Sequence, residues 1–343
     1  ETQAMNVGVA GAGVIGLSCA YELLRRGHEV TVFDARPVTA STSWAAAGML
    51  GPAYEMFLHP DHEVSGLAAL CFESAALWAE FSERVHCDSG LPVGYRREPT
   101  LALAQSAEET RALQALKAVL GERGARAAWL DVPRARNQFG LSPDVQAVLQ
   151  LDGDHQVDNR KLLMALRSAV LALGGCLIRQ DVTTLVDARQ KSGNGLDTLV
   201  WARGRREEAV TSCVKGQALS LERQPGMPDH VVRFGSAYVV PKADRVIIGA
   251  TSEADYAHTG VDQTTIEQLY MRACSVLPKL SSAERLEAWS GLRPKSEDGL
   301  PVLKRLNDQE FVAAGHFRHG ILLAPITARA IADLVEGKTP VGA

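Results

Sequence analysis

The residues with the clearest chemical meaning form a glycine-rich turn near the start of the chain. Gly11-Ala12-Gly13-Val14-Ile15-Gly16 lies between a short apolar run at 6–10 and a segment of helical character at 17–26. Glycines at this spacing permit a tight turn, the close approach of a pyrophosphate and the packing of helix against strand. Asp34 ends the next β-prone run, 29–33, where a carboxylate can accept hydrogen bonds from ribose hydroxyls. The pattern predicts a βαβ unit that binds FAD or NAD, and by itself it does not distinguish the two.

A candidate anion-binding residue lies in the last third of the chain. Arg293 is flanked by Leu292 and Pro294, and a guanidinium held among apolar neighbours would bind a carboxylate through two parallel hydrogen bonds. The alternative is a structural salt bridge or an exposed arginine, which is the usual fate of this residue type. His316 and His319 could act as acids or bases, but a histidine at a helix start more often bonds backbone or cofactor groups.

The elements that must position these residues change character along the chain. Apolar residues fall at helical spacing from Val64 to Val85, Ser106 with Glu109 predicts a capping box, and Asp158 predicts another helix start. Strand-like segments occur at 99–104, 214–221, 231–234, 237–241, 245–250 and 311–314, and further helices are predicted at 264–276 and 320–336. The run of short strands in the middle of the chain predicts a mostly antiparallel sheet.

These patterns predict an α/β fold, α+β overall, in two lobes. The chain has 343 residues, which is long for one ordinary core. A discontinuous Rossmann-type nucleotide-binding lobe is expected at 5–55, 150–213 and 299–343. A substrate lobe with the mostly antiparallel sheet is expected at 56–149 and 214–298.

The composition narrows the class of protein. A net charge of -4 with 22% charged residues offers no bulk attraction to nucleic acid. The six cysteines have no CxxC or Cys/His spacing, which predicts neither a metal site nor a disulfide framework and favours a reducing, cytoplasmic location. No signal peptide and no membrane span is expected, and we interpret Met5 as the natural start. The oligomeric state, including a homo-oligomer, stays open.

Three segments carry a resemblance to a known family. Ser41-Thr42-Ser43-Trp44-Ala45-Ala46-Ala47-Gly48-Met49-Leu50 resembles the flavin-contacting loop of the superfamily of D-amino-acid, glycine and sarcosine oxidases, which use FAD. The segments 291–301 (GLRPKSEDGLP) and 314–325 (AGHFRHGILLAP) look like the two C-terminal signatures of glycine oxidases. Matches run from Met5 to about Gly337, so the resemblance covers nearly the whole chain. It implies FAD as the cofactor, and the loop argues against a plain NAD-dependent dehydrogenase.

The resemblance also implies residue roles. Arg293 occupies the position that binds the substrate carboxylate, Arg318 matches a second active-site arginine of the glycine oxidase branch, and Tyr238 resembles a tyrosine that lines the substrate pocket. The FAD-binding residues expected from the glycine motif and the resemblance are Gly11, Gly13, Val14, Ile15, Gly16, Asp34, Ala35, Thr42, Ser43, Ala47, Gly48, Met49, Val182, His316, Phe317, Arg318, His319, Gly320, Ile321 and Leu322.

The implied reaction moves the α-hydrogen of an amino acid as hydride to flavin N5. The imine then hydrolyses, and oxygen is reduced to hydrogen peroxide. No side chain need act as a base, because orientation and electrostatics suffice for a deprotonated amine. The substrates considered are glycine, sarcosine and dicarboxylates such as iminodiacetate. Two alternatives stay open: a dehydrogenase that passes electrons to a quinone or a partner protein, and a tRNA-modifying flavoprotein, which the net charge disfavours.

Three departures from the family pattern bear on these expectations. Sarcosine oxidases attach flavin through a cysteine in the region of 291–293, and none occurs there, which predicts non-covalent FAD. His319 stands where an asparagine is expected. An Ala-Thr/Ser-Gly-x-Trp-Ser stretch is expected shortly before residues 214–217. It is missing, because residues 210–213, which do not match it, lead directly into 214–217. Either the chain has a deletion that weakens a central strand near the flavin, or a segment is absent from the printed sequence.

Overall fold

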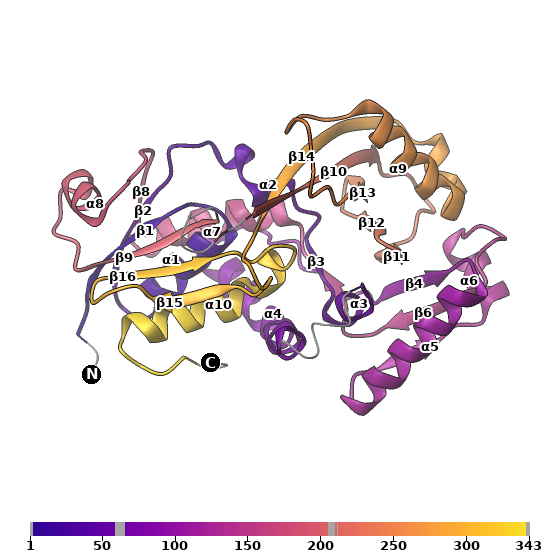
Figure 1. Cartoon of the computed structure of the whole chain (residues 1–343), viewed down its shortest axis with the longest axis horizontal. Coiled ribbons are helices and arrows are strands. Elements are labelled where there is room, and N and C mark those ends of the chain that lie inside the picture. The colour runs from indigo at the N-terminus through magenta and orange to yellow at the C-terminus, as the bar shows by residue number, and fades with distance from the viewer. Residues whose placement is uncertain (1–2, 59–65, 205–209, 211, 341–343) are drawn as a thin grey trace.

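The first lobe is built on a six-stranded sheet (Figure 1). The computed structural model describes residues 3–58, 66–204, 210 and 212–340. Within them, the strands lie in the order β15 (Val302–Arg305), β16 (Glu310–Ala314), β9 (Thr198–Gly204), β1 (Asn6–Ala10), β2 (Glu29–Phe33) and β8 (Cys176–Ile178). All neighbours are parallel except β15 and β16. This is the Rossmann-type arrangement that the βαβ start predicted.

Both faces of this sheet are buried, because alternate residues of each strand point to opposite sides. Val200 and Ala202 of β9 face one apolar cluster, while Leu199 and Trp201 face the other. The first cluster packs against a layer of four helices: α1 (Val14–Arg25), α4 (Leu67–Ser89), α7 (Asn159–Ala172) and α10 (Gly320–Val335). The short helix α8 (Leu185–Ser192) covers the second.

A second sheet of eight strands forms the other lobe (Figure 1). Its order is β14 (Arg285–Lys295), β10 (Ser212–Glu222), β13 (Arg245–Gly249), β12 (Ala237–Pro241), β11 (Val232–Phe234), β4 (Thr100–Ala104), β6 (Ala147–Leu151) and β5 (Ala127–Trp129). All pairs are antiparallel except β11 with β4. The mostly antiparallel sheet is therefore confirmed.

Helices cover this second sheet, except for the part of one face that is turned toward the first lobe. The cluster that contains Val239 includes residues of α6 (Val132–Phe139) and α9 (Gln263–Val276). Its strand neighbours Tyr238 and Val240 belong to a separate cluster with Ala47, so they lie on the opposite face. The helices α3 (Pro52–Leu58) and α5 (Ala107–Glu122) pack together beside β4.

Local sequence signals set several helix starts as predicted. The Ser106 hydroxyl accepts a hydrogen bond from the Glu109 backbone N–H at the start of α5. The Asp158 carboxylate accepts bonds from two backbone N–H groups at the start of α7. The apolar pattern predicted from Val64 is confirmed from Leu67 onward as α4, and its first residues lie outside the described part of the chain.

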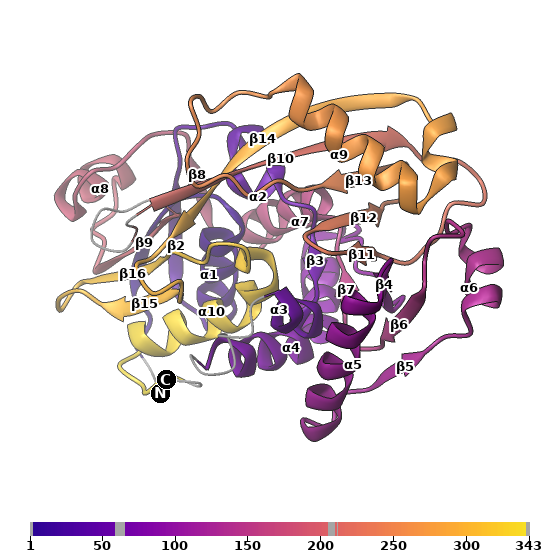
Figure 2. The ribbon, with the colours of Figure 1, turned by 45° about the vertical axis from the view of Figure 1, so that its right-hand side comes forward.

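The two sheets meet along the long paired strands β10 and β14. Figure 2 shows these strands running from the first lobe toward α9, and Val214 of β10 pairs with Arg293 of β14. A small sheet of β3 (Met49–Leu50) and β7 (His155–Gln156) and the helix α2 (Thr42–Ala45) lie near this junction. The short 3-10 helices η1 (Val38–Ala40) and η3 (Pro278–Ser282) complete the elements described.

One of the two alternatives for the stretch missing before 214–217 was a deletion that weakens a central strand, but the central strand β9 is paired on both sides. Strand β9 is present between β1 and β16, in the middle of the six-stranded sheet. It ends in Ala202-Arg203-Gly204, which keeps the Ala-x-Gly pattern of the stretch sought near 210, with arginine at its centre. The pattern therefore lies farther before β10 than expected, and residues 205–209 and 211 of the connection lie outside the described residues.

The division of the chain into lobes at particular residues stays a prediction. Helix α4 falls in the range 56–149 that we assigned to the substrate lobe, yet it packs against α7 and α10 beside the six-stranded sheet. Its apolar stripe indicates burial but does not reveal which sheet it covers. None of the helices described is long and apolar enough to cross a lipid bilayer.

Candidate active site

The glycine turn between β1 and α1 has no room for side chains at two of its glycines. Gly11 has a φ of +115°, and a Cβ atom there would lie 2.4 Å from the backbone oxygen of Ala202. A Cβ atom on Gly16 would lie 1.9 Å from the oxygen of Gly11. Glycine is the residue that tolerates both conditions. The turn therefore brings the N-terminus of α1 close to β9, as a dinucleotide site requires.

Asp34 closes the far end of this site as an ionised acceptor. Its Oδ2 accepts a hydrogen bond from the Ala12 N–H at 3.0 Å, and its Oδ1 accepts one from the Arg36 N–H at 3.0 Å. Burial alone would raise the pKa of Asp34, but these N–H groups and the Arg36 guanidinium bring it below the usual value. A carboxylate with spare lone pairs can accept further bonds from hydroxyls.

Three cavities lie in a row between Asp34 and Arg293. The first is lined by Asp34, Arg36 and Arg167. The second shares Arg36 with it and also contains Gly13 and Ile15. The third shares five residues with the second: Val14, Thr42, Ser43, Phe317 and Gly320. Shared walls place the cavities side by side, so the site can hold one long ligand across both lobes.

The loop of small residues at 41–50 forms one wall and is held from several sides. The Ser43 hydroxyl accepts a bond from the Val14 N–H at 3.0 Å, and the Asn159 amide donates to the Ser43 carbonyl at 2.8 Å. Trp289 Nε1 donates to the Ala45 carbonyl at 2.8 Å. Gly48 has a φ of +75°, and a Cβ atom there would lie 2.0 Å from the Val157 oxygen. These contacts bring backbone rather than bulky side chains to the cavity.

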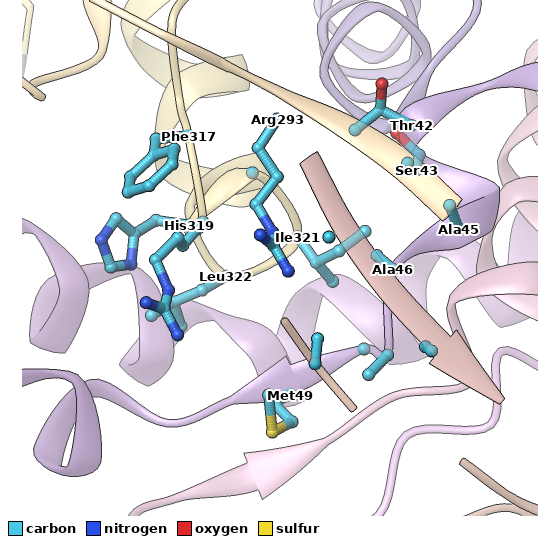
Figure 3. A pocket seen from close by; sticks show the side chains of 18 of the residues that line it. Thr42, Ser43, Ala45, Ala46, Met49, Arg293, Phe317, His319, Ile321 and Leu322 are labelled. Carbon is cyan, nitrogen blue, oxygen red and sulfur yellow. The ribbon is translucent and has the colours of Figure 1, made fainter. Parts of the chain in front are cut away.

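The N-terminus of α10 forms the opposite wall. Gly320, Ile321 and Leu322 line the cavity at the first turn of this helix, where unpaired N–H groups and the helix dipole give a positive potential. Phe317 precedes the helix with a φ of +49° and donates its N–H to the Pro294 carbonyl at 3.0 Å. Figure 3 shows Phe317, His319, Ile321 and Leu322 around the cavity.

The two histidines of this segment are buried beside the helix start. His316 Nε2 lies 2.9 Å from the Thr327 hydroxyl, and burial lowers the pKa of His316 to about 3. The imidazole of His316 is therefore neutral at ordinary pH. His319 lies at the N-cap position, is 2% exposed and lines the cavity.

Arg293 extends from β14 into the cavity (Figure 3). Its Nη1 and Nη2 both donate to the Thr251 carbonyl, at 3.2 Å and 3.3 Å. Among the residues described, none provides a carboxylate within ion-pair distance of Arg293. A Cβ atom on Gly216 of the paired strand would lie 2.2 Å from Nη2, so this glycine makes room for the guanidinium. Burial lowers the pKa of Arg293, but arginine stays charged in proteins.

Tyr238 fits its site in the same way. It lies on β12 opposite Gly249 of β13, where a Cβ atom would lie 2.3 Å from the tyrosine ring. Tyr238 is 7% exposed and lines the cavity. Burial raises the pKa of Tyr238, so the phenol stays neutral.

Arg318 lines the same cavity and approaches an acid that sequence reasoning missed. Its Nε lies 3.8 Å from Oε2 of Glu55, which is on α3 and is 9% exposed. Gln217 and Trp289 also line the cavity and were not predicted. The available signal for Glu55 was an acidic residue within the otherwise apolar run 51–58, directly after the small-residue loop.

Most predicted site residues come together at these cavities. The residues that line them are Gly13, Val14, Ile15, Asp34, Thr42, Ser43, Ala47, Gly48, Met49, Tyr238, Arg293, His316, Phe317, Arg318, His319, Gly320, Ile321 and Leu322. Gly11 and Gly16 shape the turn instead. Ala35 is exposed beside Asp34. The Val182 side chain is buried in the apolar cluster that includes Phe33 and Leu185, and its backbone carbonyl accepts a hydrogen bond from Arg203, which lines the second cavity.

Comparisons with known proteins agree with this geometry. The model of a family described as FAD dependent oxidoreductase matches residues 6–334. The glycine oxidase of Geobacillus kaustophilus (strain HTA426) is 32% identical over 365 aligned residues, which cover 98% of this chain and 94% of that protein. The crystal structure of glycine oxidase from Geobacillus kaustophilus has a TM-score of 0.84 at 30% identity, covering 98% of this chain and 96% of that one.

A more distant structure shares the fold. The crystal structure of iminodiacetate oxidase from Chelativorans sp. BNC1 has a TM-score of 0.78 at 20% identity, with 97% of this chain and 96% of that chain covered. At this identity the likeness shows the architecture alone.

Proposed function

The chain belongs to the FAD dependent oxidoreductase family, and on that premise we propose that it oxidises the carbon–nitrogen bond of a small amino acid or N-substituted glycine. The observation that carries the proposal is Arg293, a cation at the cavity wall whose two hydrogen bonds both go to one backbone carbonyl. Glycine oxidases are among the relatives that match over nearly the full chain, and their name is consistent with a small substrate bearing one carboxylate.

The residues present fit FAD. The glycine turn excludes side chains where a pyrophosphate approaches α1, and Asp34 is an ionised acceptor for ribose hydroxyls at one end of the row of cavities. At the other end, the first turn of α10 offers a positive potential to the electron-rich edge of a flavin. FAD supplies the acceptor for the hydride that leaves the α-carbon of the substrate.

The protein's own groups bind and orient the amino acid. After two donations to the Thr251 carbonyl, Arg293 keeps its Nε–H and one N–H on each Nη atom. The Nε–H and the N–H of the Nη atom on the same side of the planar guanidinium point in one direction, which suits a bidentate bond to a carboxylate. The phenol of Tyr238 lines the same cavity in its neutral form. His316 is neutral and bonded to Thr327, so we assign it no proton transfer. Catalysis then depends on orientation, with the substrate amine entering deprotonated.

The finer substrate assignment depends on Arg318. Glycine and sarcosine need one carboxylate site, which Arg293 provides. A secondary amine with two carboxymethyl arms, such as iminodiacetate, would use Arg318 for the second arm, because this guanidinium lines the same cavity. The imine product hydrolyses to an oxo acid and an amine, and molecular oxygen is the proposed acceptor, reduced to hydrogen peroxide.

The test is a substrate screen on the FAD-loaded protein. Hydrogen peroxide release and oxygen consumption are measured with glycine, sarcosine, iminodiacetate, D-alanine and D-proline. We expect turnover with glycine or an N-substituted glycine and weaker turnover with the bulkier amino acids. Substrate-dependent bleaching of the flavin without oxygen consumption would show a dehydrogenase instead, and no bleaching with any of the five would refute the proposed substrate class.

A further inference from the structure

A buried arginine lies behind the wall of the substrate cavity. Arg233 is on β11, its residue is 1% exposed, and it is among the largest fully buried side chains of the described chain. A buried guanidinium is costly unless its charge is paired and its N–H groups are bonded. The partners of Arg233 therefore indicate what it does.

These partners are residues of the cavity wall. Arg233 Nη2 donates to Oε1 of Glu55 at 3.2 Å, and Nη1 lies 3.5 Å from the sulfur of Met49. The guanidinium carbon is 4.1 Å from the ring centre of Tyr54 and 5.9 Å from that of Tyr238, distances that favour attraction to an aromatic face. Met49, Glu55 and Tyr238 line the cavity, so Arg233 contacts its wall from behind.

Glu55 is shared between two arginines. Its Oε1 faces Arg233, while its Oε2 lies 3.8 Å from Nε of Arg318. Together with Arg293, these side chains comprise three guanidinium groups and one carboxylate, a net charge of +2. Asp154 lies at the start of α3, where its carboxylate accepts bonds from the backbone N–H groups of Ala53 and Tyr54. Burial raises the pKa of Asp154 to about 7, against the lowering effect of these N–H groups and of Arg233.

A second acid that affects Arg293, Glu253, is already paired with a cation. Glu253 lies 3.6 Å from Nζ of Lys215, and it also accepts bonds from Gln217 and Thr251. Among the side chains that the structure describes, the positive excess therefore lies at the cavity end that contains Glu55 and Arg318. Without Arg233, the Oε1 atom of Glu55 would lose a guanidinium partner, and its negative charge would act more strongly on an incoming anion.

We propose that Arg233 is a specificity-determining residue. By binding Glu55 from behind, it keeps this carboxylate from repelling a second anionic group of the substrate and from occupying Arg318. The cavity then accepts an N-substituted glycine that carries a second carboxylate. This inference rests on the proposed function, because it assumes that Arg293 binds the first carboxylate.

The experiment compares two secondary amines that differ by one carboxylate, sarcosine and iminodiacetate. Arg233→Met should lower the iminodiacetate-to-sarcosine ratio of kcat/KM by about 10-fold or more, chiefly through KM for iminodiacetate, since one charged interaction is lost. Arg233→Lys should keep most of the ratio. Adding Glu55→Gln to Arg233→Met should restore it, because the carboxylate that Arg233 neutralises is then gone.

Controls separate this role from a structural one. Arg245 is a comparable buried arginine of the same sheet, 3.3 Å from Asp158, and Arg245→Met should leave the ratio unchanged. FAD content and thermal unfolding are measured for every variant. Where Arg233→Met does not fold, Glu55→Gln alone must raise the ratio, since it makes the cavity more positive.

An unchanged ratio in a folded Arg233→Met protein, or no recovery in the double variant, would overturn the inference and leave the proposed function standing. A wild-type protein that oxidises sarcosine and not iminodiacetate would also overturn the inference and leave the proposed function standing. A wild-type protein that oxidises no glycine derivative would refute the proposed function and this inference with it.

Discussion

Replacing Arg293 by alanine tests the carboxylate site directly. Arg293 has five N–H groups, and the three left after two of them bond to Thr251 include the Nε–H and its neighbouring Nη N–H, which are the ones available to a substrate carboxylate. A charge-assisted hydrogen bond is worth about 1.5–3 kcal/mol, which corresponds to roughly 10- to 150-fold in kcat/KM for each bond lost. We therefore expect Arg293→Ala to lower kcat/KM for glycine or sarcosine by at least about tenfold, mainly through KM, with Arg293→Lys recovering only part of the loss.

The assay is oxygen consumption over a range of substrate concentrations, with flavin absorbance to confirm that FAD remains bound. Arg285 offers a matched control, because it lies on the same strand and forms an exposed ion pair with Glu267 at 2.7 Å. Arg285→Ala should leave kinetics near those of the wild type. Gly216→Ala approaches the same question from the paired strand, since its Cβ atom would displace the guanidinium. Near-normal kinetics in a FAD-loaded Arg293→Ala protein would refute the carboxylate role.

Three further predictions concern the cofactor and the second arginine. Acid or heat precipitation should release FAD into the supernatant, because no cysteine occurs at 291–293; flavin that stays in the pellet would contradict non-covalent binding. Arg318→Met should impair iminodiacetate about 10-fold more than glycine or sarcosine in kcat/KM, whereas equal losses on all substrates would show that Arg318 supports the cofactor or the fold. Asp34→Asn should weaken FAD binding and lower the melting temperature at neutral pH. Because the folded-state pKa of Asp34 is below its usual value, the carboxylate stabilises the protein above pH 4 and this contribution is lost as pH falls further; a stability difference between wild type and variant that does not shrink in acid would argue against this role.

Parts of the fold that depend on neighbouring residues were predictable from the sequence. The glycine turn at 11–16 and the caps at Ser106 and Asp158 use contacts between residues a few positions apart. Their geometry is set by backbone sterics and by short side chains that bond nearby N–H groups. A dinucleotide site was predictable for the same reason, because its first half is one continuous βαβ unit, and the resemblance of the loop at 41–50 indicated FAD.

Arg293 was predicted as a site residue, but the strand that carries it was not predicted. Residues 285–295 form β14 because they pair along nearly their whole length with β10, and such pairing depends on a partner distant in sequence. The local signal for a strand is weak, since Gly291 and Pro294 lie within it. Long-range contacts likewise decided that β9 pairs with β1 at the centre of the first sheet, and they decided against which sheet α4 packs.

The charge arrangement at the substrate cavity was decided only by the tertiary structure. Glu55, Arg233 and Arg318 come from α3, β11 and the turn before α10, and nothing in their local sequence relates them. The same holds for the glycines that make space for other side chains, Gly216 for Arg293 and Gly249 for Tyr238. The sequence alone determined which cofactor and which carboxylate-binding residue to expect, because short motifs encode them. Which charges compensate one another depends on distances of a few ångströms between distant segments, and packing alone sets those distances.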